Sequence, residues 1–251
     1  PDFGDNDEGF FYKLGLEENF DSFVKSIGNF LKQEEYYGEI QKLFQIYQIE
    51  NDIEYEKMEN KIFFPKGKYF VYKDKRNYIF VHNQNQEYHS HSDGMSIELV
   101  LDNKNILVDS GTFNYNIDKK KRKYYRSTLS HNTVWMDGDQ AEQIGSFRWI
   151  DGPETKLEYF ESDNKYFIKG NIKTNKRKEH IRKIEFDRDF NEIKIEDEIS
   201  NVDNFILNWI FSEEMELEKI TERKYEINRT DYEIEIFSKE NIKIELLKCN
   251  Y

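Results

Sequence analysis

The stretch Glu192-Ile-Lys-Ile-Glu-Asp-Glu-Ile199 alternates apolar and charged side chains along most of its length. Successive side chains of a β-strand point to opposite faces, so a strand with this pattern has one buried face and one face in water. Sheets with one solvent-exposed face are typically antiparallel. The stretch therefore predicts an antiparallel sheet that covers a core with one of its faces.

Segments of similar character lie on both sides of this stretch, beginning at about Lys61. We predict further strands at 69–72, 78–81, 97–101, 106–108, 132–136, 156–160, 166–172, 180–186, 205–211, 225–227, 232–237 and 242–247. So many strands in succession favour a mainly β fold, a large antiparallel β-sandwich, over an alternating βαβ fold.

Residues 17–50 have a helical period instead. Their apolar side chains recur at three- and four-residue spacing, which predicts two amphipathic helices. Two such helices cannot form a core alone and need a further surface to cover. We therefore divide the chain into 1–52, the end of a helical domain, and 53–251, the β domain.

Composition limits the possible classes of protein. A chain of 251 residues can bury a large core. The net charge of −13 argues against nucleic-acid and anionic-membrane partners, which require a basic surface. The single cysteine, Cys249, excludes an internal disulfide, and no apolar run is long enough to span a membrane. The chain does not begin with Met, and we expect it to be part of a longer protein.

Three of the five histidines lie between residues 89 and 131. If residues 89–93 are extended, His89 and His91 point to the same face. Asp109 ends an apolar run and His131 precedes another, so both are expected at strand ends. Two imidazoles and a carboxylate, from His91, Asp109 and His131, are a plausible zinc-binding set that leaves His89 free beside the metal. The alternative, that these are partly buried and hydrogen-bonded histidines, stays open.

The motifs around these residues are His89-x-His-x-Asp-Gly94, Asp109-Ser-Gly-Thr-x-x-Tyr115 and Arg126-Ser-Thr-x-x-His-Asn-Thr133. In order and spacing they resemble the C-terminal domain of the heparinase II/III-like polysaccharide lyases. The resemblance is dense over residues 80–150 and thin after 150. The segment 3–9 also resembles a stretch near the end of the family's helical domain.

This resemblance implies that uronic-acid glycans are cleaved by β-elimination, as in bacterial glycan degradation, in a cleft between an α/α toroid and the sandwich. It implies that His89 is the catalytic histidine and that zinc is bound by His91, Asp109 and His131. Tyr115 and Arg126 belong to the same pattern. For Tyr115 packing is favoured over acid/base catalysis, whereas Arg126 is expected either to pair with a uronate or to support its loop.

The segment 119–126 carries six cationic side chains in eight positions. We expect it to be a loop, either simply solvated or acting as a local electrostatic funnel for an acidic glycan. The partners that the resemblance implies are an acidic polysaccharide or oligosaccharide and the toroid domain of the same protein. A periplasmic or extracellular location is favoured on the same ground.

The toroid's catalytic motifs have no counterpart in this chain, which puts its activity as an isolated chain in doubt. An alternative is a non-catalytic sandwich that binds carbohydrate or packs against a partner domain. A metal-dependent hydrolase or isomerase with a cupin-like barrel would also fit His-x-His, but it predicts a small closed barrel, and the chain has too many strands for that.

Overall fold

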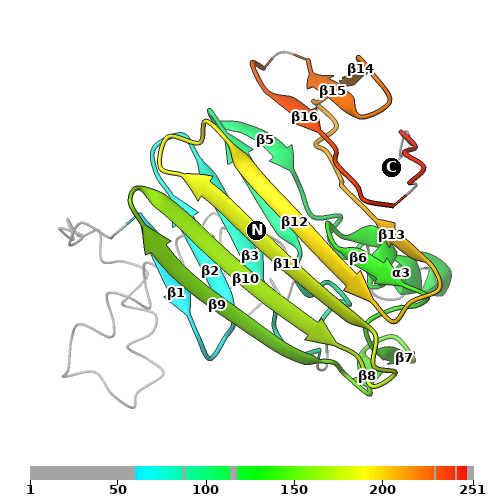
Figure 1. The fold of residues 1–251 in the computed structure, drawn as a ribbon. Coiled ribbons are helices and arrows are strands. Elements are labelled where there is room, and N and C mark those ends of the chain that lie inside the picture. The colour runs from blue at the N-terminus through cyan, green and yellow to red at the C-terminus, as the bar shows by residue number, and fades with distance from the viewer. Residues whose placement is uncertain (1–59, 87–88, 114–117, 229, 241, 248–251) are drawn as a thin grey trace, which may run out of the picture. The chain divides into compact units, whose positions relative to one another are not determined.

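The computed structural model of the chain describes residues 60–86, 89–113, 118–228, 230–240 and 242–247. In this part of the chain, strands dominate and are accompanied by one short α-helix and one 3-10 turn (Figure 1). Every strand pairing described is antiparallel, so the predicted mainly β, antiparallel fold is confirmed. The two predicted helices at 17–50 and the division between 52 and 53 lie outside the described residues.

Two meanders form the main sheets, because each strand pairs with the next one along the chain. The first has five strands, in the order β1 (Lys61–Phe64), β2 (Tyr69–Lys73), β3 (Tyr78–His82), β4 (Ile97–Leu101) and β5 (Lys104–Leu107). The second has four, which are β9 (Glu154–Ser162), β10 (Lys165–Lys173), β11 (Glu179–Asp187) and β12 (Ile193–Ser200).

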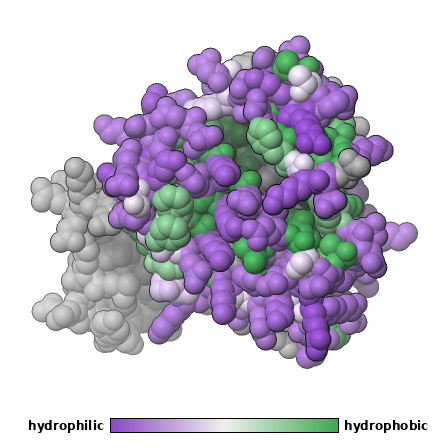
Figure 2. Space-filling view, viewed as in Figure 1, coloured by the Kyte–Doolittle hydropathy of each residue, from purple (hydrophilic) through white to green (hydrophobic). Residues whose placement is uncertain are grey.

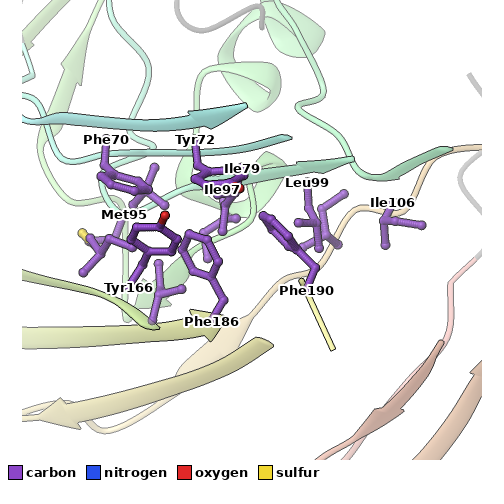
Figure 3. Packing of buried hydrophobic residues seen from close by; sticks show 14 of the residues in the cluster. Phe70, Tyr72, Ile79, Met95, Ile97, Leu99, Ile106, Tyr166, Phe186 and Phe190 are labelled. Carbon is purple, nitrogen blue, oxygen red and sulfur yellow. The ribbon is translucent and has the colours of Figure 1, made fainter. Parts of the chain in front are cut away.

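The core lies between these two sheets and contains side chains from both of them. Figure 3 shows Phe70 and Tyr72 of β2 facing Tyr166 of β10 and Phe186 of β11. The ring centroids of Tyr72 and Tyr166 are 5.3 Å apart, and those of Phe70 and Phe186 are 6.2 Å apart. Full burial of side chains of this size stabilises a fold by about 1.5–3 kcal/mol each, so this aromatic layer contributes substantially to holding the two sheets together.

Alternation along the strands sets which side chains enter the core. In β11 every second residue is buried, and the set includes two polar residues, His180 and Arg182, as well as Ile184 and Phe186. The opposite face of β9–β12 is covered largely by hydrophilic side chains with smaller hydrophobic areas between them (Figure 2). None of the helices in the described ranges is long and apolar enough to cross a membrane.

Short elements complete the described chain. They are α3 (Lys119–Tyr125), η2 (Thr128–Ser130), the pairs β6 (Val134–Met136) with β13 (Phe205–Leu207) and β7 (Glu142–Ile144) with β8 (Arg148–Ile150), and a sheet of β14 (Leu217–Lys219), β15 (Lys224–Ile227) and β16 (Glu233–Glu235).

Three local predictions are wrong. Residues 242–247 form no strand, and the predicted strand 205–211 ends at Leu207. The basic segment predicted as a loop contains helix α3, because the Asp118 side chain caps it by accepting hydrogen bonds from the backbone N–H groups of Lys120 and Lys121 at 2.9 and 3.1 Å.

Candidate metal centre

Three segments outside the strands bring the predicted ligands together. His91 lies in the irregular connection between β3 and β4, Asp109 follows β5, and His131 ends the 3-10 turn η2. Each of the three side chains offers one nitrogen or oxygen atom to a common point, and these three atoms lie within 4.8 Å of one another. The predicted meeting of these side chains is therefore present in the structure.

The donor set and its burial fit a divalent metal ion. His91 and His131 are fully buried, and their ring centroids are 5.1 Å apart. Two imidazoles and a carboxylate make a ligand set of the kind found in catalytic zinc sites, which keep a fourth position for water or substrate. His131 Nε2 has no hydrogen-bond partner among the described residues, as expected of a nitrogen available to an ion. The group could hold a metal.

An ion pair joins two of these residues. His131 Nδ1 lies 2.6 Å from Asp109 Oδ2. Burial lowers the pKa of His131, but the charge of Asp109 and the hydrogen bond to it outweigh this effect and raise the pKa to about 9. Burial likewise raises the pKa of Asp109, and His131 brings it below its usual value. Without a metal, the proton on His131 balances the buried carboxylate, and a metal ion would take over that role.

Two further buried ionisable residues lie beside this group and were not predicted as site residues. His82 ends β3, and its Nε2 lies 3.7 Å from Asp93 Oδ2. Burial lowers the pKa of His82, whereas the charge of Asp93 adds to the rise in the pKa of His131. Neither carboxylate oxygen of Asp93 has a hydrogen-bond partner in the described part of the chain. His82 closes an apolar strand as many surface residues do, so no sequence signal distinguishes it.

The residues that follow His131 fasten the three segments to one another. Asn132 is fully buried, and its Nδ2 donates to the carbonyl oxygens of Ile97 at 2.8 Å and Val108 at 2.9 Å. Val108 immediately precedes Asp109. Thr133 Oγ1 donates to the carbonyl of Gly94 at 2.7 Å, in the segment that carries His91. The His-Asn-Thr motif therefore combines a candidate ligand with two side chains that hold the segments of the other two candidate ligands.

Gly94 is required by close packing. Gln140 pairs with both of its backbone groups, at 3.0 Å for the N–H and 3.1 Å for the carbonyl. A Cβ on Gly94 would lie 2.8 Å from Gln140 Oε1 and 3.1 Å from Ile172 Cδ1. A larger residue would push the loop away from β10, so the glycine of the motif has a steric role.

The predicted common face of His89 and His91 is wrong. His89 is exposed and has a φ of 63°, whereas His91 is fully buried in an irregular segment rather than an extended one. Between them, the Ser90 carbonyl accepts hydrogen bonds from Arg126 Nη2 at 2.9 Å and Trp149 Nε1 at 2.8 Å. These bonds hold the chain in a turn, so the two histidines separate into different environments.

The remaining predicted residues differ in their placement. Arg126 is fully buried, and its guanidinium lies 4.9 Å from the centroid of the Trp149 ring. Arg122 is also buried, so the exposed cations of α3 are Lys119, Lys120, Lys121 and Lys123. Tyr115 lies outside the described residues.

Residues 57–246 match the family model of the heparinase II/III-like C-terminal domain. No curated protein matches the sequence.

Several solved structures share the fold. A heparinase III described as the BT4657 gene product aligns with a TM-score of 0.59 at 18% identity, over 80% of this chain and 32% of its own. Heparan sulfate lyase HepC from Pedobacter heparinus aligns with a TM-score of 0.62 at 16% identity, over 90% of this chain and 34% of its own. The chain thus spans about a third of the length of these structures, and at such identities the likeness concerns the fold alone.

Proposed function

Because residues 57–246 place this chain in the heparinase II/III-like family as its C-terminal domain, we propose that it is part of a polysaccharide lyase that cleaves uronic-acid-containing glycans by β-elimination. The observation that carries the proposal is the buried group of His91, Asp109 and His131, formed by the motifs that link the chain to the family. We propose zinc as the ion of this group.

The reaction sets clear demands on the site. A base removes the proton at C5 of the uronate, beside the C6 carboxylate, and the C4 glycosidic oxygen leaves with a proton supplied by an acid. The carboxylate must be neutralised as negative charge develops. The base and the acid must also lie within hydrogen-bond reach of the sugar.

We assign the acid/base role on this domain to His89. Imidazole suits proton transfer near neutral pH. The side chain is exposed, and it lies against the Phe147 ring at a centroid distance of 5.0 Å. The backbone N–H of His89 donates to the Phe147 carbonyl at 2.9 Å. This hydrogen bond stabilises the left-handed backbone conformation of His89, whose φ of 63° is unfavourable for a residue other than glycine. Strain of this kind is often found at functional sites.

Zinc, when bound to His91, Asp109 and His131, would supply positive charge to this part of the site. The chain's own residues hold the ligands in place through Asn132 and Thr133. The four exposed lysines of α3 would raise the local concentration of an acidic glycan in a protein that is acidic as a whole.

A non-catalytic role in glycan binding or domain packing is the second candidate. It is a candidate because elimination needs groups on both sides of the sugar, and among the described residues only His89 is assigned such a role. We expect this chain alone to bind acidic oligosaccharides weakly and to show no elimination above background.

The two candidates are separated by an assay of the full-length protein on a panel of acidic polysaccharides, with ultraviolet absorbance of the unsaturated uronate as the readout. Product formation by the full-length protein, abolished by removal of the metal, supports the lyase. Glycan binding without any unsaturated product, at every pH and with zinc added, contradicts it and favours the binding module.

A further inference from the structure

A buried ion pair lies in the second sheet. Arg182 of β11 is fully buried, and its Nε and Nη2 donate to the two carboxylate oxygens of Asp197 in β12 at 2.7 and 3.0 Å. The guanidinium also lies 4.9 Å from the centroid of the Trp209 ring. Buried charges are costly even when paired, so this pair needs a reason beyond stability.

The remaining guanidinium nitrogen connects the sheet to the metal-ligand segments. Arg182 Nη1 donates to the carbonyl oxygens of Asn132 at 2.7 Å and Met95 at 2.8 Å. Asn132 follows the ligand His131, and Met95 lies four residues beyond the ligand His91. One side chain of the second sheet therefore bridges the two histidine-bearing segments.

Met95 occupies a conformation that needs such support. Its φ is 62°, although it has a side chain and is fully buried. Its N–H donates to the His82 carbonyl at 2.7 Å, and its side chain fills the space over Gly170, where a Cβ would come within 1.8 Å of Met95 Sδ. A strained residue persists where its surroundings fix it from several sides. Arg182 supplies the contact at the carbonyl.

We propose that Arg182, oriented by Asp197, is a positioning residue that sets the spacing of His91 and His131 and thereby the affinity of the centre for its metal. The inference rests on the proposed metal centre. Arg182 does not touch the ligand side chains. It acts by fixing the backbone on either side of them, and residues outside the ligand shell commonly change metal affinity by about 10–100-fold.

The test compares Arg182→Lys with Ile184→Ala in the full 251-residue chain. Lys keeps the charge beside Asp197 but cannot reproduce the planar fork that reaches the carboxylate and two carbonyls together. Ile184 is buried two positions along the same strand, and its truncation destabilises the core without touching Arg182's contacts. Asp197→Asn is a second variant, which removes the charge that orients Arg182.

The readouts are zinc affinity, measured by competition with a chelator on protein shown to be folded by circular dichroism, and the visible absorption spectrum of the cobalt(II)-loaded protein. We expect Arg182→Lys to lower zinc affinity about 10–100-fold and to change the cobalt spectrum. Ile184→Ala should leave both close to the wild type, and Asp197→Asn should change both in the direction of Arg182→Lys, by a smaller amount.

Wild-type affinity and an unchanged spectrum in folded Arg182→Lys would overturn the inference while leaving the metal centre intact. If Arg182→Lys does not fold, wild-type zinc affinity and an unchanged cobalt spectrum in Asp197→Asn would overturn the inference instead. Equal losses in Ile184→Ala would also count against it, because they would show an effect of general destabilisation. A wild-type chain that binds neither zinc nor cobalt would overturn the metal centre itself, and this inference with it.

Discussion

At the level of single residues, His89 and His91 are two positions apart and occupy opposite environments. His91 is fully buried within ligand distance of Asp109 and His131, whereas His89 is exposed on a strained turn. The hydrogen bonds from Arg126 and Trp149 to the Ser90 carbonyl produce this separation. Two histidines of one motif therefore lie in different environments, which is consistent with the proposal that only His91 binds an ion.

Replacing each histidine alone should show whether the two side chains have different roles. We expect His89→Ala to lower lyase turnover of the full-length protein by about 10²-fold or more while leaving zinc content unchanged, because it removes a proton-transfer group but no ligand. His91→Ala is the matched control and should lose zinc. The measurements are unsaturated product and elemental analysis. Loss of zinc with normal turnover in His89→Ala would contradict the assignment.

Asn132 gives a prediction about stability. Asn132→Ala leaves the buried carbonyls of Ile97 and Val108 without their side-chain donor, and it removes the acceptor of the Ile210 N–H, 2.6 Å from Asn132 Oδ1. We expect the free energy of unfolding in urea to fall by at least about 1–3 kcal/mol, since unsatisfied buried groups are costly. Asn191→Ala, at an exposed position, should change it by less than about 0.5 kcal/mol.

At the level of elements, helix α3 concentrates exposed positive charge. We expect the replacement of Lys119, Lys120, Lys121 and Lys123 by Gln to weaken binding of an acidic oligosaccharide and to reduce the salt dependence of that binding. The control replaces an equal number of exposed lysines of the second sheet and its turn, Lys169, Lys173, Lys176 and Lys194, so that the net charge stays matched. Equal weakening in both variants, measured by calorimetry at several salt concentrations, would rule out a local role for α3.

The elements also show what the sequence can predict. The strands of the second sheet were predicted because alternation such as that in β12 directly reflects one wet and one buried face. Helix α3 was missed because its basic side chains carry no apolar period, and its stability depends on the Asp118 cap. The grouping of His91, Asp109 and His131 was predicted from ligand chemistry and from the motifs of the family resemblance. His82 and Arg182 were not, because their roles come from contacts between residues far apart in the sequence.

At the scale of the whole molecule, the stability of the fold should depend on pH through the buried polar face of β11. His180 Nε2 lies 2.6 Å from Asp197 Oδ1, and both residues belong to the network of Arg182. Burial lowers the pKa of His180. Burial raises the pKa of Asp197, but Arg182 and His180 bring it well below its usual range. The folded protein therefore contains a neutral imidazole that donates to an ionised carboxylate.

The sign of the pH dependence follows from these directions. Unfolded His180 takes up a proton below about pH 6.5, whereas folded His180 does so only at lower pH, so its contribution is present above about pH 6.5 and is lost as the pH falls. Asp197 contributes stability above about pH 4 that is lost as the pH falls further toward its folded pKa. Buried His82, whose pKa burial also lowers, acts in the same direction as His180, whereas His131, whose pKa is raised to about 9 without a metal, acts in the opposite direction and offsets part of the loss.

We expect the free energy of unfolding of the chain in urea to decrease between pH 7 and pH 5.5, by at most about 1.4 kcal/mol per pH unit for each buried histidine. His180→Gln keeps a donor for Asp197 but cannot titrate, so its unfolding free energy should fall less steeply over that interval. Lys183→Gln, which changes the exposed side of the same strand, should keep the wild-type slope. An identical slope in wild type and His180→Gln would show that the imidazole titrates in the folded protein as it does in the unfolded chain, and a steeper fall in His180→Gln would show that the imidazole is charged in the folded state.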